Sequence, residues 1–295
     1  MEFALGVGEW FATFCANLSV TNGGVISTRY RAITRRLNTD YWETNSEDTH
    51  SLYVGSYGRN TAIHGISDVD MVFQLPYYVY QQYDAYAGNG QSALLQAVRE
   101  SIKRTYSVTS IGADGQVVCV PFTDGITFEL LPGFLNTDGG YTFPDANGGG
   151  SWRVTNPRAE IAAMRNRNNA CNGNLIPLCR MMREWKNRWS VPVSGLLIDT
   201  LAYQFIEKWE YRDRSFLYYD LMCREFFDFL ALQDENQQFW RAPGSGQYVW
   251  KTGNFQYKAR RCYNITTDAL NYQNNNQDWS AKKQWREIFG TAFPD

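Results

Sequence analysis

The 295-residue sequence has few of the residues that bind structural zinc or form a disulfide scaffold. It has only two histidines, His50 and His64, and its six cysteines are scattered without a C-x-x-C pair. Structural zinc sites need clustered Cys and His ligands, and disulfide scaffolds are typical of much smaller secreted chains. The composition therefore argues against both classes. We expect the thiols to be reduced, in a protein of the cytoplasm.

The sequence also lacks a long apolar run. No run reaches the about 18 residues that a membrane-spanning helix needs, and Glu2 and Glu9 interrupt the apolar N-terminal stretch. That stretch has neither the basic region nor the small-residue cleavage site of a secretory leader. We expect no contact with a membrane and interpret the stretch as an amphipathic helix. The sequence does not end in a flexible glycine-rich tail, so conjugation through the C-terminus is not expected.

A strong excess of charge of either sign is absent as well, because the net charge is −2. We therefore expect no stable complex with nucleic acid. The two halves differ, however: residues 1–150 hold 8 basic and 15 acidic residues, and residues 151–295 hold 20 basic and 15 acidic ones. Within the second half, residues 153–188 alone hold 8 basic and 2 acidic residues. An acidic half beside a basic one suits a site where carboxylates hold metal ions and cations hold phosphate. Solvated faces of unequal charge would give the same counts.

Hydrophobic periodicity predicts an α+β half followed by a helical half. In the first half, helices are predicted over 4–21, 25–38 and 91–106, and strands over 52–54, 68–75, 117–121 and 126–131. Residues 135–150, rich in Gly, Asn and Asp, are predicted to form a long loop. In the second half, helices are predicted over 157–170, 175–189, 194–210, 215–231 and 256–272, with a closing segment over 279–289. We expect a catalytic core over residues 1–155 and a helical domain over residues 156–295.

Three carboxylates stand out in the predicted strands. Residues i and i+2 of a strand point to one face, so Asp68 and Asp70 project side by side. Glu129 is a charged residue inside the apolar strand 126–131, where a charge is rarely buried without a partner. If the two strands are neighbours, the three carboxylates converge. The alternative is that Asp68 and Asp70 face solvent on an edge strand.

Convergent carboxylates are typical of a two-metal site. Two Mg²⁺ ions about 3.5–4 Å apart support in-line phosphoryl transfer, and Mn²⁺ can substitute for them. The turn Gly55-Ser56 ends twelve residues before Asp68. It can present backbone N–H groups and a hydroxyl to phosphates, because glycine permits close approach. The combination of turn, D-x-D strand and third carboxylate is far more specific than any one of them.

These residues lie in a longer motif that resembles the signature of the bacterial cGAS/DncV-like nucleotidyltransferases, or CD-NTases. The motif reads Gly55-Ser56-Tyr57-Gly58-Arg59-Asn60-Thr61-Ala62-Ile63, followed by Ser67-Asp68-Val69-Asp70. The resemblance continues over residues 5–294 in Glu129-Leu130-Leu131-Pro132, the segment WRVTNP at 152–157, Trp185-Lys186, Ser194 with Gly195-Leu196-Leu197, and Trp285–Gly290 with Phe293-Pro294.

The resemblance implies a polymerase-beta-like nucleotidyltransferase core and a C-terminal helical domain, with the active site in the cleft between them. It implies synthesis of a cyclic di- or trinucleotide second messenger from nucleoside triphosphates, with release of pyrophosphate. It further implies a monomer whose product activates an effector protein in anti-phage defence. The catalytic and metal-binding residues would be Asp68, Asp70 and Glu129.

By the same resemblance, Gly55, Ser56, Lys186 and Ser194 bind the donor nucleotide. The alternative for Lys186 is a surface lysine on an amphipathic helix. The alternative for Ser194 is a helix N-cap, and a capping serine can also bind phosphate. Arg59 can touch a phosphate or form a structural ion pair, which is the preferred interpretation. Two features depart from the family: the third carboxylate, often Asp in this superfamily, is Glu129, and no Cys/His cluster corresponds to the zinc insertion of the animal DNA sensor.

Two rival functions stay open on the sequence alone. One is another enzyme of the superfamily, making linear oligonucleotides or nucleotidylating a small molecule or protein. The other is a catalytically silent nucleotide-binding scaffold, against which the three carboxylates argue. The sequence does not specify the bases, the 2′–5′ or 3′–5′ linkage, the ring size, the effector or the activating signal.

Overall fold

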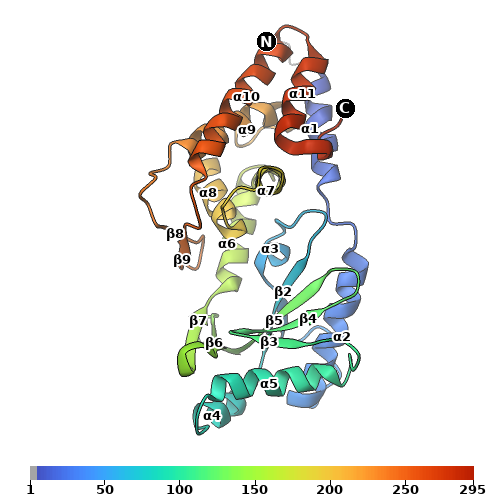
Figure 1. Cartoon of the computed structure of the whole chain (residues 1–295), viewed down its shortest axis with the longest axis vertical. Coiled ribbons are helices and arrows are strands. Elements are labelled where there is room, and N and C mark those ends of the chain that lie inside the picture. The colour runs from blue at the N-terminus through green and yellow to red at the C-terminus, as the bar shows by residue number, and fades with distance from the viewer. Residues whose placement is uncertain (1–4) are drawn as a thin grey trace. The chain divides into compact units, whose positions relative to one another are not determined.

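The computed structural model describes residues 5–295, which form two compact units (Figure 1). The sheet unit comprises residues 20–59 and 65–161. The helical unit comprises residues 5–19, 60–64 and 162–295. This division differs from the single boundary expected after residue 155, since the first helix and the segment 60–64 group with the later helices.

The sheet unit is built on a mixed sheet with the strand order β1-β2-β5-β4-β3. β2 and β5 are parallel, whereas β1 pairs with β2, and β4 with its two neighbours, in antiparallel fashion. The strands are β1 (Ser51–Tyr53), β2 (Asp68–Gln74), β3 (Gly112–Asp114), β4 (Val117–Pro121), β5 (Thr127–Leu135), β6 (Tyr141–Asp145) and β7 (Ser151–Thr155). The end of β5 pairs with β6, which pairs with β7.

Helices cover one face of this sheet because the strands bury alternate residues there. The helices of the unit are α2 (Gly23–Tyr41), α3 (Gly55–Gly58), α4 (Tyr77–Asp84) and α5 (Gly90–Lys103). Val69 and Met71 of β2 and Phe128 of β5 are fully buried with Ile33 of α2 and Leu94 of α5. Each such side chain stabilises the fold by about 1.5–3 kcal/mol. The opposite parity, which includes Asp68, Asp70 and Glu129, therefore points to the other face.

The helical unit packs its elements around a core rich in aromatic rings. These elements are α1 (Leu5–Asn17), α6 (Pro157–Ala170, of which the residues up to Ile161 belong to the sheet unit), α7 (Leu175–Trp189), α8 (Gly195–Lys208), α9 (Tyr219–Ala231), α10 (Gln256–Asn274), α11 (Asp278–Phe289) and the hairpin β8 (Phe239–Arg241) and β9 (Tyr248–Trp250). The ring of Phe11 in α1 lies 5.0 Å from that of Trp285 in α11, and Phe14 lies 4.6 Å from Phe289. These contacts explain why the first helix belongs to this unit.

Most predicted elements are confirmed, with three corrections. The predicted loop over 135–150 is wrong in part, since it contains β6 and the 3-10 helix η1 (Asn147–Gly149). The predicted helix over 215–231 is η2 (Phe216–Tyr218) followed by α9. α3, α4, β3, β7 and the β8–β9 hairpin were not predicted. The first predicted helix is α1, and its residue 4 lies outside the described residues. Among residues 5–295, no helix is long and apolar enough to cross a bilayer.

Candidate active site

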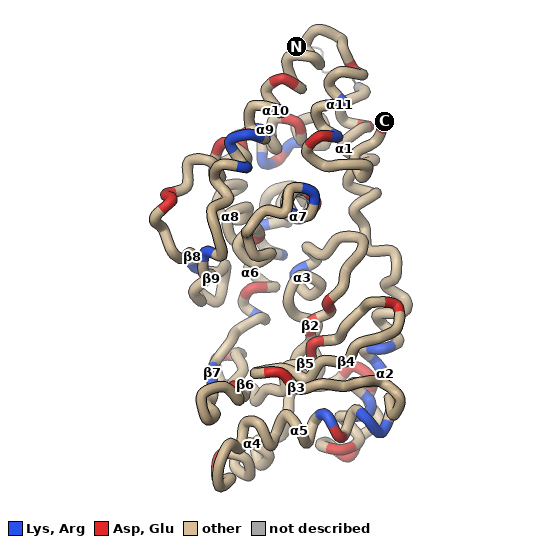
Figure 2. The backbone as a smooth tube through the Cα atoms, viewed as in Figure 1, with Lys and Arg blue, Asp and Glu red and all other residues tan. Residues whose placement is uncertain are grey.

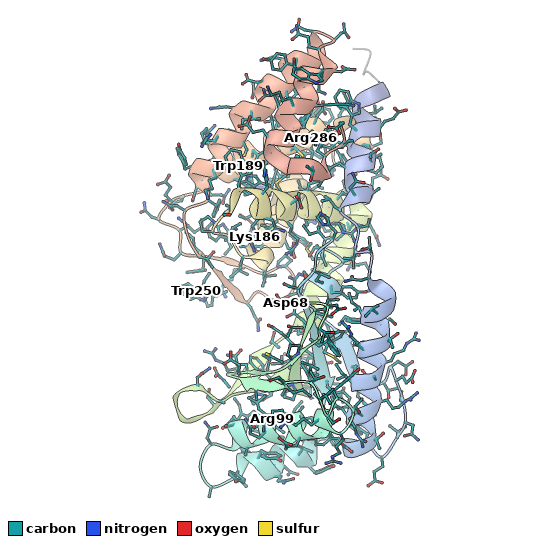
Figure 3. All side chains as sticks on the ribbon, turned by 45° about the vertical axis from the view of Figure 1, so that its right-hand side comes forward. Asp68, Arg99, Lys186, Trp189, Trp250 and Arg286 are labelled. Atoms are coloured by element: carbon teal, nitrogen blue, oxygen red, sulfur yellow. The ribbon has the colours of Figure 1, made fainter. Side chains whose placement is uncertain are left out.

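The register of β2 and β5 brings the three predicted carboxylates to one face of the sheet. Asp70 lies directly opposite Glu129, and Asp68 lies opposite Thr127. Figure 2 shows the acidic positions of the two strands beside each other, and Figure 3 labels Asp68. This confirms that the strands are neighbours, as the convergence of the carboxylates requires. The alternative interpretation, in which Asp68 and Asp70 lie on an edge strand, is wrong, because β1 and β5 pair with the two sides of β2.

The carboxylate face carries more negative charge than the sequence predicted. Glu129 is half-buried, and burial, followed by the charges of Asp70, Asp68 and Asp114, raises its pKa. Asp114 ends β3 and pairs with Val117 of β4 across the turn Gly115-Gln116. Sequence reasoning missed Asp114, although a two-residue loop that begins with glycine, here Gly115, between two short strands is a hairpin signal. The arrangement is a patch of carboxylates on which a cation would relieve repulsion.

Gly55 places the predicted phosphate-binding turn against one of these carboxylates. Gly55 begins α3 with φ +57°, a conformation that favours glycine. A Cβ atom built on Gly55 would lie 1.8 Å from Asp70 Oδ2. The backbone N–H of Val54 donates to the carbonyl oxygen of Asp70 at 3.0 Å. The structure thus brings Gly55, the following Ser56 and Asp70 together within the sheet unit.

Two neighbours of this turn have structural contacts. Arg59, directly after α3, forms an ion pair of 3.3 Å with Glu160 of α6, and both side chains are buried. The preferred interpretation of Arg59 is therefore confirmed. The ring of Tyr57 lies 4.8 Å from that of Tyr53, which agrees with a packing role.

Lys186 and Ser194, the other predicted nucleotide ligands, belong to the helical unit. Ser194 is the N-cap of α8, where its Oγ accepts the N–H of Leu197 at 3.1 Å. A capping hydroxyl keeps its own O–H as a donor, so the cap leaves phosphate binding open. Lys186 lies in the last turn of α7 and is labelled in Figure 3. Burial, and then the charge of Arg183, lower the pKa of Lys186.

The carboxylate face can accept hard divalent cations. Over residues 5–295, no three Asp, Glu, His or Cys side chains already stand as a preformed metal site. The donor set nevertheless fits, because Mg²⁺ is bound through carboxylate oxygens. The raised pKa of Glu129 shows charge that lacks compensation. Asp68, Asp70 and Glu129 are therefore the residues that would hold such ions.

The chain has the polymerase-beta-like nucleotidyltransferase fold, with the carboxylates on a parallel strand pair and the glycine turn before it. The whole chain is similar in fold to CdnC of Escherichia coli MS115-1, solved with ATP, with a TM-score of 0.68, 14% identity and full coverage of both chains. Residues 5–168 match the Second Messenger Oligonucleotide or Dinucleotide Synthetase domain. The chain therefore belongs to this family, among the bacterial CD-NTases.

Two curated relatives are also similar. One, from Bacillus cereus (strain VD146), is named a probable cyclic nucleotide synthase and is 24% identical over 181 residues, which cover 57% of this chain. That match spans 51% of the relative, about half its length. The other, from an Acinetobacter strain, is named a cyclic AMP-AMP-AMP synthase. It is 22% identical over 272 residues, which cover 85% of this chain and 75% of the relative.

Proposed function

We propose that this chain synthesises a cyclic di- or trinucleotide second messenger from nucleoside triphosphates. The observation that carries the proposal is the register of Asp70 opposite Glu129, with Asp68 on the same face and Gly55 against Asp70. Membership of a family described as second messenger synthetases supports it, as do the names of the two curated relatives.

In this proposal, the chain's own residues bind and orient the donor. Gly55 and Ser56 contact the triphosphate through backbone N–H groups and the hydroxyl, while Lys186 and Ser194 contribute a charge and a further O–H. The 2′- or 3′-hydroxyl oxygen of the acceptor forms a bond to the α-phosphorus. The bond from that phosphorus to the bridging oxygen breaks, pyrophosphate leaves, and the hydroxyl proton passes to water. Transfers of the same kind, a second for a dinucleotide and also a third for a trinucleotide, close the ring.

The three carboxylates would hold two Mg²⁺ ions, or Mn²⁺ in their place. When bound, such ions neutralise the triphosphate charge and lower the pKa of the attacking hydroxyl. Glu129 reaches one methylene farther than an Asp would. Burial and the neighbouring carboxylates raise its pKa, and a bound cation would oppose this by favouring the ionised form.

The proposal is tested by product analysis. The purified chain is incubated with four labelled nucleoside triphosphates and Mg²⁺ or Mn²⁺, then treated with phosphatase and analysed by mass spectrometry. We expect a phosphatase-resistant product with the mass of a cyclic oligonucleotide. Products that lose phosphate would instead indicate a linear oligonucleotide synthase. A labelled protein or small molecule would indicate nucleotidylation.

A matched pair of variants ties the product to the carboxylate face. Asp70→Asn should lower the rate by several tenfold steps, each about 1.36 kcal/mol of barrier. Asp268→Asn makes the same chemical change at an exposed position of α10 and should leave the rate unchanged. Wild-type product formation by Asp70→Asn would overturn the assignment of the active site.

We also propose that the product acts in anti-phage defence by activating an effector protein. The description of the family as a second messenger synthetase supports a messenger role. Cells carrying the gene with its native neighbours are challenged with phage, with Asp70→Asn as the matched strain. Fewer plaques on the wild-type strain are expected. Equal plaque counts would contradict the defence role while leaving the enzymatic proposal in place.

A further inference from the structure

A buried polar cluster lies beside the two proposed phosphate ligands of the helical unit. Arg183, one helical turn before Lys186 on α7, donates through Nη2 to three acceptors. These are Thr61 Oγ1 at 3.0 Å, the carbonyl oxygen of Gly195 at 3.1 Å and Asp199 Oδ2 at 2.8 Å. Thr61 also donates to Asp199 Oδ2 at 2.9 Å, and Thr61 and Asp199 are fully buried. One guanidinium therefore joins α7, α8 and the segment 60–64.

This cluster is a poor source of stability. Desolvation of a buried ion pair offsets most of its attraction, and replacing such a pair by apolar residues is often neutral or stabilising. The α7–α8 core already contains Trp185 and Leu197, both almost completely buried. What the ion pair adds is a fixed geometry, because a planar guanidinium bonds its partners in defined directions.

The geometry is fixed at the start of α8. A Cβ atom built on Gly195 would lie 2.2 Å from Arg183 Nη1, so the guanidinium lies directly on the backbone there. Gly195 follows Ser194, whose Oγ caps α8. A residue of α7, the helix that carries Lys186, therefore contacts the backbone directly after Ser194.

We propose that Arg183 is a positioning residue for triphosphate recognition, one that keeps Lys186 and Ser194 at a fixed distance from each other. It does so through its hydrogen bonds to Gly195, Thr61 and Asp199. The inference rests on the proposed function, because it assumes that Lys186 and Ser194 bind phosphate. Arg183 also lies close enough to act on Lys186, because burial, and then the charge of Arg183, lower the pKa of Lys186.

The test compares the affinities for a non-hydrolysable ATP analogue and for AMP, measured by calorimetry with Mg²⁺. Arg183→Met should weaken binding of the analogue about ten- to a hundredfold, the loss typical when a residue that orients ligands is removed, and leave the affinity for AMP unchanged. Lys186→Met should also weaken binding of the analogue. In the double variant, the effect of Arg183→Met should largely disappear, because the ligand that it positions is gone.

The matched control is Arg180→Met. Arg180 is on the same helix, carries the same charge and donates to Asn60 at 3.1 and 2.7 Å, rather than to Gly195 or Asp199. It should leave the ratio of the two affinities unchanged. An equal loss in Arg180→Met, or fully additive losses in the double variant, would overturn the inference and indicate a general effect of charge or folding.

A conservative variant covers the case in which Arg183→Met does not fold. Arg183→Lys keeps the charge, but its ammonium nitrogen ends one bond short of the position of Arg183 Nη2 and lacks the planar fork of donors, so it should also weaken binding of the analogue. Wild-type affinity in Arg183→Lys would overturn the inference. So would unchanged affinity in Lys186→Met, because no phosphate ligand would be left to position. Formation of a cyclic product by the wild-type chain tests the proposed function separately from either result.

Discussion

The backbone of Gly55 lies so close to the Asp70 carboxylate that a side chain on residue 55 would overlap it. Gly55→Ala should destabilise the fold by at least about 1–2 kcal/mol, the cost of a left-handed conformation for a residue with a Cβ. The new Cβ would also displace the Asp70 carboxylate, 1.8 Å away, so product formation should fall far more than stability does. Urea unfolding and the product assay measure the two effects.

Gly125 is the matched control for Gly55. It also has a positive φ, +86°, but a Cβ built there meets nothing within 4 Å. Gly125→Ala should therefore show the backbone cost of about 1–2 kcal/mol without a loss of product formation. If the two variants were equally active, the close approach of Gly55 to Asp70 would have no functional importance.

Asp220 in α9 should give the fold a pH dependence of its own. Burial raises its pKa from 3.8 to about 6, although Leu221 N–H and Gln273 donate to its oxygens. The folded state then holds the proton more tightly than the unfolded state, so the free energy of unfolding falls as the pH rises from 3.8 to about 6. Above that window the carboxylate is ionised in both states, and the penalty stays constant at up to about 3 kcal/mol.

Asp220→Asn should remove this fall, because its side chain does not ionise. The difference in the free energy of unfolding between the variant and the wild-type chain should grow in favour of the variant from pH 4 to pH 7. Urea titrations over that range measure it, and the subtraction cancels the other titrating groups. A difference that does not change with pH would show that Asp220 ionises normally in the folded protein.

At the scale of the element, the sequence predicted the strands on which the site depends. The apolar residues of 68–75 and 126–131 alternate, and a period of two leaves only one possible face for Asp68, Asp70 and Glu129. That face is confirmed by the pairing of β2 with β5. The metal-binding role of the three residues stays a prediction.

Other elements depend on contacts between distant residues, which a local pattern does not contain. In the predicted loop 135–150, the glycines serve the turns, but β6 between them is formed by pairing with β5 and β7. α4 begins directly after Pro76, which follows the predicted strand 68–75 and, as a proline, also suits the start of a helix. The β8–β9 hairpin buries only Trp240 and Val249 at its centre, a pattern too short to detect.

The same limit applies to the site. Contact of Gly55 with Asp70 depends on β1 pairing with β2. The cluster of Arg183 with Thr61 and Asp199 joins residues more than 120 positions apart. No spacing rule within a helix or strand connects such residues. Asp114, by contrast, carried a local hairpin signal and was predictable.

At the scale of the whole molecule, the two units interleave along the chain. The chain passes from one unit to the other after Ser19, Arg59, His64 and Ile161. The sheet unit therefore includes the first residues of α6, where Glu160 pairs with Arg59. A cut at the expected boundary after residue 155 would separate Arg59 from Glu160 and α1 from its aromatic partners.

Two fragments distinguish the interleaved division from the single boundary. The fragment 1–155 keeps Phe11 and Phe14 but lacks Trp285 and Phe289, against which their rings pack. Each exposed aromatic side chain costs about 1.5–3 kcal/mol, so this fragment should bind a hydrophobic dye and unfold without a sharp transition. The fragment 20–161 omits α1 and retains Glu160, and it should unfold more cooperatively, as measured by urea titration followed by circular dichroism. The opposite order of cooperativity would contradict the assignment of α1 to the helical unit.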